Sequence, residues 1–373
     1  NMDDTYNYSM WVELYNSSTS TTYNQAACYF TDNLSEPRKW NPSYKLIGPK
    51  SYSLLWFEQP DKAGHASFKL KPEGGILYLL NASAQILDSV VYPAQYRNIS
   101  YGRKNDGAAD WVFFEQFSPG LPNDNKAYAA EQCAVPVYKL PAGFYTGTKN
   151  VSFENPAPGD TIYYSRNGEE PTRKSSRYTP GYVVTISNTS IFRARTFSAG
   201  KLPSNIVTAT YFMNERNFKL PVVSIVTEQK NLTDNTIGIY VEGTNGITGN
   251  GMNTPANWNQ DWWRPANFEL YDTTLTVRLN QELDIQITGG WTRMNKQKSL
   301  KINPRNKFGE NMLRYYIFAA TKPNMKFRSI MLRNSGNDFD HSMMRDGFMQ
   351  SLVMKRMNLD YVDIFYSHRP DEK

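Results

Sequence analysis

The sequence predicts a mostly β, multi-domain protein in which two β-sandwiches are followed by an α+β unit. Short runs of β-branched and aromatic residues, separated by clusters of Gly, Pro, Asn and Asp, indicate many short strands. A length of 373 residues exceeds that of a usual single domain. A helical spacing of apolar residues follows near the C-terminus. We therefore expect three domains, at residues 1–126, 127–213 and 214–373.

The overall composition excludes several protein classes. Aromatic residues make up 14% and charged residues 20% of the chain, which excludes the intrinsically disordered class. The longest apolar runs, such as 221–226, are far too short to cross a bilayer, so we expect no transmembrane segment. Lys and Arg total 41 against 35 Asp and Glu, and this mild, dispersed excess argues against a nucleic-acid partner.

The rare residue types limit metal and disulfide chemistry. With two cysteines, Cys28 and Cys133, and three widely separated histidines, we expect no metal site. One disulfide is permitted, but two free, partly buried thiols are favoured. The chain starts at Asn1 rather than Met, so we expect that an upstream signal peptide has been removed. The many Tyr, Trp, Asn, Ser and Thr residues favour an extracytoplasmic location.

The first domain reads as a β-sandwich. Residues 11–15 and 75–80 show the alternation of a half-buried strand. Turn-forming clusters at 33–37, 71–75 and 105–107 separate such runs. Many short strands with frequent turns are typical of a sandwich.

The second domain carries a hairpin signal. Residues 161–165 form an expected strand, and Asn167-Gly168 is a strong turn dipeptide. Residues 189–197 alternate, and 206–211 follow as a further strand. With about 70 residues this unit is small for an isolated domain, so we expect it to pack on a neighbour.

The third domain mixes strands and a helix. Strands are expected at 222–226, 267–271, 283–288 and 299–302, with a strand-like end at 361–366. Apolar residues at four-residue spacing predict a helix over 342–357. The glycine-rich segment 243–251 lacks the Gly-Lys-Ser/Thr ending of a phosphate loop, so we expect a mobile surface loop there.

Two resemblances concern the β-domains. The motifs of the first domain are Trp11–Asn16, Tyr29–Asp32, Lys39–Trp40, Phe68–Leu70, Asp88–Ser89, Ser100–Arg103, Asp106–Gly107 and Ser118–Gly120. They resemble the lamin-tail domain, which implies an immunoglobulin-like binding module without catalysis. The motifs of the second are Gly143–Gly147, Ile162–Tyr164, Asn167–Gly168, Pro171–Thr172, Tyr178 and Ile191–Ala194. They look like the small immunoglobulin-like C-terminal β-domain of chitobiases and hexosaminidases, which carries no catalytic residue.

The third domain has the most informative motifs. They are Leu220–Val226, Gly238–Val241, Trp263–Ala266, Ile287–Arg293, Gln297–Lys301, Phe308–Gly309, Leu332–Asp338 and Arg345–Asp346. They are similar to the N-terminal part of the spore coat protein H (CotH) family of secreted atypical protein kinases. The resemblance implies an incomplete, α+β kinase-like N-lobe, with ATP and Mg²⁺ or Mn²⁺ as cofactors of the parent protein. We expect no cofactor to be required for folding.

A kinase N-lobe needs a lysine on a strand to neutralise the nucleotide phosphates, and Lys298 is the best candidate. On a strand over 298–302 it would share a face with Leu300 and Ile302. A lysine on an apolar face must find an anion or extend to water. The structural alternative, a lysine that reaches the surface from the strand end, stays open.

The remaining candidates for nucleotide binding surround Lys298. Gly289 and Gly290 permit close backbone approach, and Arg293 offers a bidentate donor to phosphate; an ordinary tight turn with a surface arginine is the alternative. Asp346, in the place of the helix that supplies a carboxylate in kinases, either orients Lys298 or stabilises the helix start. The structural role is favoured for Asp346.

No catalytic residue can be assigned. In the resembled family the metal-binding and catalytic acidic residues follow the matched region, so we expect this chain to be an inactive fragment. A cluster of Trp258, Trp262 and Trp263 around Arg264 suggests a sugar platform, although buried packing is the commoner fate of such residues.

Three functions compete at this stage. The first is a secreted or cell-surface kinase of bacterial type that acts on a secreted or surface protein. The second is a surface adhesion or carbohydrate-binding scaffold without catalysis, with a glycan as ligand. The third, a glycoside hydrolase, needs two carboxyl groups across a cleft, and no acidic pair is marked out for that work.

Overall fold

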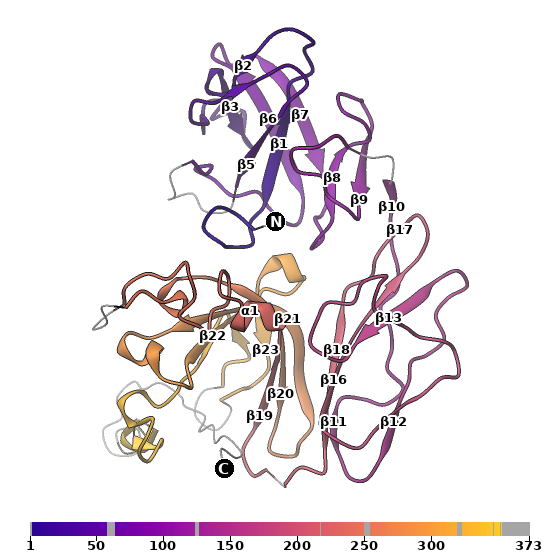
Figure 1. The fold of residues 1–373 in the computed structure, drawn as a ribbon, viewed down its shortest axis with the longest axis vertical. Coiled ribbons are helices and arrows are strands. Elements are labelled where there is room, and N and C mark those ends of the chain that lie inside the picture. Colours follow the sequence, from indigo (N-terminus) through magenta and orange to yellow (C-terminus); the bar gives the residue numbers. More distant parts are fainter. Residues whose placement is uncertain are drawn as a thin grey trace. The chain divides into compact units, whose positions relative to one another are not determined.

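The computed structural model is mostly β, as predicted (Figure 1). It describes residues 2–57, 64–123, 127–216, 218–249, 254–318, 323–345, 347–350 and 352. The chain folds as two compact units, Asn1–Cys133 with Ser198–Pro203, and Ala134–Phe197 with Ser204–Lys373. The second and third predicted domains thus share one unit, while the three-domain division itself stays a prediction. Within the described residues, no helix is both long and apolar enough to span a bilayer.

The first unit contains four small sheets. Its elements are β1 (Trp11–Tyr15), β2 (Tyr23–Asn24), η1 (Gln25–Ala27), β3 (Cys28–Thr31), β4 (Leu46–Ile47), β5 (Tyr52–Trp56), β6 (Gly75–Asn81), β7 (Ile86–Tyr92), β8 (Ser100–Arg103), β9 (Trp111–Phe114), β10 (Ala127–Gln132) and β17 (Lys201–Leu202). The sheets run β1-β5, β2-β4, β3-β6-β7 and β17-β10-β9-β8. Strand β17 belongs to this unit because it pairs with β10, and the Cys133 amide donates to the Leu202 carbonyl at 2.9 Å.

An apolar core holds the sheets of the first unit together. Phe30 of β3, Leu55 of β5 and Leu77 of β6 meet in it, so β1-β5 and β3-β6-β7 pack face to face as a sandwich requires. Cys28 and Cys133 are buried thiols that form no disulfide, as favoured from the sequence. Burial raises the pKa of the Cys28 thiol to about 11, which keeps it protonated and unreactive. The resemblance to a lamin-tail domain stays a prediction.

The second unit begins with another two-sheet β-domain. Its strands are β11 (Gly143–Tyr145), β12 (Lys149–Val151), β13 (Thr161–Ser165), β14 (Ser176–Arg177), β15 (Val184–Ile186), β16 (Ser190–Phe197) and β18 (Val207–Met213). A five-stranded sheet, β11-β18-β16-β13-β14, faces the pair β12-β15. Phe153, Phe192 and Tyr211 fill the core between them. The predicted strands at 161–165, 189–197 and 206–211 are confirmed.

The turn at Gly168 touches the following domain. Gly168 has a φ of 82°, and a Cβ there would lie 2.8 Å from the Thr227 carbonyl oxygen. Its own carbonyl accepts a 3.0 Å hydrogen bond from buried Arg193. The connection from β13 to β14 covers residues 166–175, so it is longer than the two-residue hairpin that Asn-Gly favours. This β-domain packs on its neighbour, as its small size predicted.

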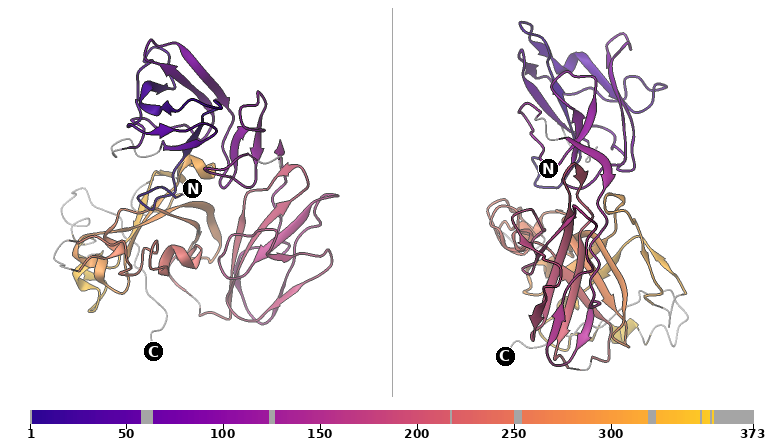
Figure 2. Two further views of the ribbon diagram at one scale, coloured as in Figure 1. Left: turned by 45° about the horizontal axis from the view of Figure 1, so that its top comes forward. Right: turned by 90° about the vertical axis from the view of Figure 1, so that its right-hand side faces the viewer.

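An antiparallel sheet dominates the rest of the second unit. The elements are β19 (Val222–Val226), α1 (Gln229–Thr233), η2 (Asn257–Asn259), β20 (Arg264–Tyr271), β21 (Val277–Thr288), η3 (Trp291–Met294), β22 (Ser299–Asn303), η4 (Asn306–Phe308), β23 (Leu313–Arg314), β24 (Lys326–Phe327), β25 (Ile330–Leu332) and η5 (Gly336–Asp338). Five strands lie side by side in the order β19-β20-β21-β22-β25. Figures 1 and 2 show β18 of the preceding domain beside this sheet.

The helix predicted over 342–357 begins at Arg345, three residues later than predicted, because residues 342–344 form a turn. Residues 345, 347–350 and 352 are helical. The predicted apolar stripe is exposed at Met344, Phe348 and Leu352, so packing against described residues does not account for its spacing. The strand-like segment 361–366 lies outside the described residues.

The two faces of the sheet differ in chemistry. The register pairs Ala266 with Leu283 and Ile285 with Ile302, so one face is apolar. The opposite face carries polar residues, of which Asn267, Glu269 and Asp284 are buried, Ser224 and Glu282 are half-buried and Asn280 is exposed. Burying a polar group without a hydrogen-bond partner costs from about 1 to several kcal/mol. The buried members of this set therefore need partners.

The preceding β-domain supplies many of these partners. The amide of Thr210 in β18 donates to Glu269 at 3.2 Å, and the Thr210 hydroxyl contacts the Ser224 hydroxyl at 2.8 Å. Asn280 donates to the Thr208 carbonyl at 2.8 Å, and Arg193 to Glu282 at 3.0 Å. The β-domain and the sheet therefore form one continuous structure within the second unit.

We predict that Glu269→Gln stabilises the protein more at pH 7.5 than at pH 4.5. Burial raises the pKa of the Glu269 carboxyl above its usual value of 4.5. The folded-state pKa of this carboxyl is therefore higher than its unfolded-state pKa. The protonated carboxyl stabilises the fold below the unfolded-state pKa, and this contribution is lost as the pH rises through the folded-state pKa. Gln keeps the acceptor oxygen and carries no charge, so urea unfolding of the variant should show a larger gain in stability at pH 7.5 than at pH 4.5. The matched control Glu310→Gln, an exposed glutamate, should show no such pH-dependent difference.

Candidate functional site

Lys298 lies directly before β22, on the apolar face of the sheet. The strand begins at Ser299, one residue later than predicted, but Lys298 still falls on the side of Leu300 and Ile302. Its ammonium donates to the carbonyl of Arg293 at 2.5 Å and to that of Asn295 at 3.2 Å. The ammonium also lies 3.9 Å from the ring centre of Trp258 and 5.5 Å from that of Tyr240.

This surrounding is unusual for a lysine. Its side chain is buried, with 6% of the residue exposed, and no carboxylate among the described residues pairs with it. Desolvation lowers the pKa of Lys298 to about 8, since the nearby carbonyls and rings stabilise the charge less than water does. Lys298 therefore does not reach the surface, contrary to the structural alternative. Its ammonium is held by uncharged groups that an anion could replace.

The segment before Lys298 folds around Arg293. Gly289 has a φ of 105°, and a Cβ there would lie 2.9 Å from the Thr292 hydroxyl. After Gly290 the chain forms the 3-10 helix η3 rather than a plain β-turn. The Arg293 guanidinium donates to the carbonyls of Gly289 at 2.7 Å and Asn259 at 2.9 Å, and it pairs with exposed Asp261 at 3.2 Å. Arg293 thus stabilises the turn.

Four of the five predicted site residues are brought together in this way. Gly289 and Gly290 begin the turn, and Arg293 donates hydrogen bonds to the carbonyls of both. The Arg293 carbonyl in turn accepts from the Lys298 ammonium. Asp346 lies outside the described residues, so its two predicted roles stay predictions. This geometry favours a structural role for Arg293. The partners of the Lys298 ammonium are neutral carbonyls, so an anion could take their place.

The tryptophan cluster is packed into the fold. Trp258 lies under Lys298, and Trp262 lies 4.9 Å from the Arg264 guanidinium, with both rings buried. Arg264 is fully buried on the apolar face and donates to the Ile237 carbonyl at 2.7 and 2.9 Å. Arg264 and Lys298, the two cations on this face, therefore have the same kind of surroundings: carbonyl oxygens and a tryptophan ring. Trp258 and Trp262 therefore form no exposed sugar platform, whereas Trp263 is half-buried beneath the Lys301 and Arg305 side chains.

The glycine-rich segment 243–249 lies at the surface, as expected, with Thr244, Ile247 and Thr248 exposed, but its glycines pack closely on residues 256–259. A Cβ at Gly243 would lie 2.1 Å from the amide of Asn257, and one at Gly246 would lie 2.3 Å from the Ala256 nitrogen. Buried Asn257 accepts from the Asn245 amide at 3.1 Å and donates to the Gly238 carbonyl at 3.2 Å. The glycines permit this close approach.

Sequence reasoning did not single out Asn334, which organises the neighbourhood of Lys298. Its side-chain oxygen accepts from the Ser299 hydroxyl at 2.9 Å, and its amide donates to the carbonyls of Gln297 at 2.8 Å and Thr292 at 3.3 Å. One buried amide thus joins strand β22 to both ends of the segment 292–297. Its signal in the sequence is its place within the CotH-like motif Leu332–Asp338.

Asp338 plays a similar part in the next segment. Its carboxylate accepts from the backbone amides of Ser342, Met344 and Arg345 at 3.2, 3.0 and 2.9 Å, and from the Ser342 hydroxyl at 2.5 Å. These donors, with the Arg345 guanidinium at 3.3 Å, hold the pKa of Asp338 well below its usual value. The carboxylate therefore caps the helix that starts at Arg345.

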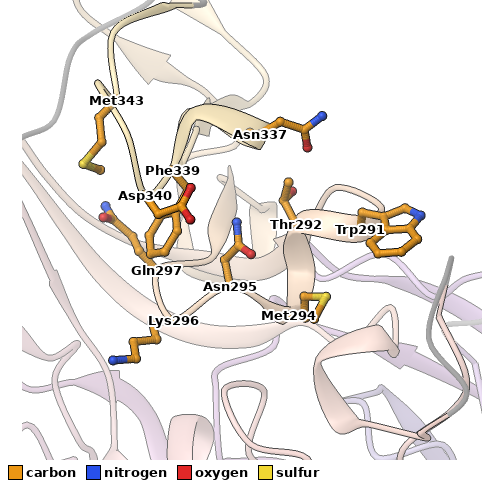
Figure 3. A pocket seen from close by; sticks show the side chains of 11 residues that line it. Trp291, Thr292, Met294, Asn295, Lys296, Gln297, Asn337, Phe339, Asp340 and Met343 are labelled. Atoms are coloured by element: carbon orange, nitrogen blue, oxygen red, sulfur yellow. The ribbon is translucent and has the colours of Figure 1, made fainter.

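A pocket of about 760 Å³ opens between these two segments. It is lined by residues of 291–297 and of 336–343. In Figure 3, Trp291, Thr292 and Met294 lie on one side and Phe339, Asp340 and Met343 on the other, with Asn295 between them. Lys298 does not line this pocket, because segment 293–297 covers it.

Two protein-family models match parts of the second unit. Residues 285–367 match the family model described as CotH kinase protein. This stretch near the C-terminus is therefore similar to that family. Residues 140–208 match the model of the chitobiase/beta-hexosaminidase C-terminal domain, which covers most of the β-domain beside it. No curated protein and no solved structure matches the chain.

The match to the CotH model includes β22, the loop around Arg293, and the two buried residues with several hydrogen bonds, Asn334 and Asp338. It does not reach β19, β20 or the packed glycine-rich segment. Among the described residues no group of three or more His, Cys, Asp or Glu side chains is arranged to hold a metal ion.

We predict that Asn334→Ala loosens the loop over Lys298. The substitution removes partners from the Gln297 carbonyl and the Ser299 hydroxyl, which costs about 2 to 4 kcal/mol for a buried amide of this kind. Hydrogen exchange at residues 291–298 should speed up, and urea unfolding should show the loss of stability. Exposed Asn337, three residues later, provides the matched control, and Asn337→Ala should change neither measurement. Unchanged exchange in Asn334→Ala would contradict the assigned role.

Proposed function

We propose that this chain carries the nucleotide-binding portion of a secreted or cell-surface CotH-like atypical protein kinase. Lys298 would neutralise the phosphates of ATP bound with Mg²⁺ or Mn²⁺, and the two β-domains would serve as binding modules. The single observation that supports this is the environment of Lys298, a buried ammonium held by two carbonyls and two rings with no acidic partner among the described residues.

An ammonium binds a charged oxygen more strongly than a neutral carbonyl oxygen. Exchanging a hydrogen bond to a carbonyl for one to a charged phosphate oxygen would lower the free energy, since hydrogen bonds between ionised groups are about twice as strong as neutral ones. Both carbonyls come from one short segment, Arg293 and Asn295, so a local movement of that segment would free the ammonium. A metal ion bound with the nucleotide supplies neutralisation of the remaining phosphate charge.

The other parts of the proposal follow from this assignment. Gly289 and Gly290 would let the backbone approach the phosphates, while Arg293 keeps its structural role in the turn. No described residue is given a catalytic role. The substrate would be a secreted or surface protein, and the location extracytoplasmic. Inactivity of the chain by itself stays a prediction.

The test is calorimetric titration of the chain with Mg-ATP at pH 7. We expect saturable binding that weakens at least about tenfold in Lys298→Met, because the charge is lost while the aliphatic stem still fills the space between the rings. Lys296→Met is the matched control, since Lys296 is exposed and two residues away. Circular dichroism should show both variants folded.

Proton binding gives a second readout of the same residue. Because the pKa of Lys298 lies near 8, its charge falls as the pH rises through this value. The affinity for Mg-ATP should therefore decrease between pH 7 and pH 9 in the native chain, and this pH dependence should disappear in Lys298→Met.

Failure would favour the second candidate function. If the folded chain binds no Mg-ATP, or if Lys298→Met binds it as well as the native chain, then Lys298 is a structural cation like Arg264. The adhesion or glycan-binding scaffold would then be the better account of the chain.

A further inference from the structure

We propose that the pocket between segments 291–297 and 336–343 is a binding site for a neutral carbohydrate. This site is distinct from the nucleotide site proposed at Lys298, whose side chain does not line it. The pocket measures about 760 Å³, which falls within the size range of small-molecule sites. The inference draws on the shape, rigidity and chemistry of the pocket.

The walls of the pocket are fixed from behind by buried hydrogen bonds. Asn334 holds the carbonyls of Thr292 and Gln297 in one wall, and its oxygen accepts from the Gly336 amide at 3.2 Å at the start of the other. Asp338 fixes the second wall through the backbone of 342–345. A site whose walls are already ordered binds a ligand with a smaller entropic cost.

An exposed ring offers a flat apolar surface at the rim. Trp291 is 60% exposed although it belongs to an ordered 3-10 helix, and Phe339 lines the opposite wall. Exposed aromatic rings of this kind stack on the apolar C–H face of a pyranose. Trp291 differs in this respect from Trp258 and Trp262, which are buried.

Side-chain amides complete the lining. Asn295, Gln297 and Asn337 line the pocket, and none of their side-chain amides hydrogen-bonds to another described residue. Each amide offers both a donor and an acceptor. Hydroxyl groups, which also donate and accept, are the complementary ligand groups, and a sugar presents several of them beside an apolar face.

The charges of the lining disfavour an anion. Lys296 is the cationic side chain among the described lining residues, and it extends away from the other labelled side chains in Figure 3. The Asp340 carboxylate contacts His341 at 2.8 Å. A phosphate or carboxylate in this pocket would therefore meet a carboxylate and no inward-facing cation, whereas a neutral ligand meets no such penalty.

The experiment titrates the chain with neutral hexasaccharides of β-1,4-linked glucose, α-1,4-linked glucose and β-1,4-linked N-acetylglucosamine, followed by calorimetry. We expect saturable binding of at least one of them, weakened about tenfold or more in Trp291→Ala. Tyr182→Ala is the matched control, because Tyr182 is an exposed aromatic residue of the preceding β-domain. Asn295→Ala combined with Asn337→Ala should weaken binding in the same direction.

A competition experiment separates this site from the nucleotide site. Saturating Mg-ATP should not displace the hexasaccharide, and Trp291→Ala should bind Mg-ATP like the native chain. The proposal is overturned if none of the three hexasaccharides binds, if Trp291→Ala binds them unchanged, or if Tyr182→Ala alone abolishes binding. Displacement by Mg-ATP would also overturn it, since the pocket would then belong to the nucleotide.

Discussion

Complete burial of strand β20 is the constraint on which the second unit depends. All residues from Arg264 to Tyr271 are buried, so both faces of this strand must be covered along its whole length. Residues before the strand cover one face, where Ile237 accepts from Arg264, and the preceding β-domain covers the other, where Thr210 donates to Glu269. Because unpaired buried polar groups are costly, each contact also fixes the position of its neighbour.

The same burial explains why the sheet holds two cations on an apolar face. Arg264 stays charged at any pH that a protein meets, and carbonyl oxygens and a tryptophan ring are sufficient to keep it there. Lys298 has an equivalent surrounding, but its ammonium loses its proton near pH 8. A lysine in this position can therefore respond to an anion, to pH and to movement of a single loop, and an arginine cannot do so to the same degree.

That loop connects the two proposed sites without merging them. Its inner side contacts Lys298 through the carbonyls of Arg293 and Asn295, and its outer side lines the pocket through Trp291 and other side chains. Asn334 anchors the loop at both ends. The inner and outer sides of one anchored loop therefore serve the two proposed sites separately.

The sequence by itself determined the mostly β fold and the strands at 161–165 and 222–226, because alternation and turn residues act locally. Lys298 became a candidate through the resemblance to the CotH family, which periodicity alone did not supply. The sequence could not determine that Lys298 is held by carbonyls, that Arg293 stabilises its own turn, or that Gly243 packs against Asn257. These outcomes depend on residues distant in the chain. Only the tertiary structure, by burying both faces of one sheet, decided which polar groups had to find one another.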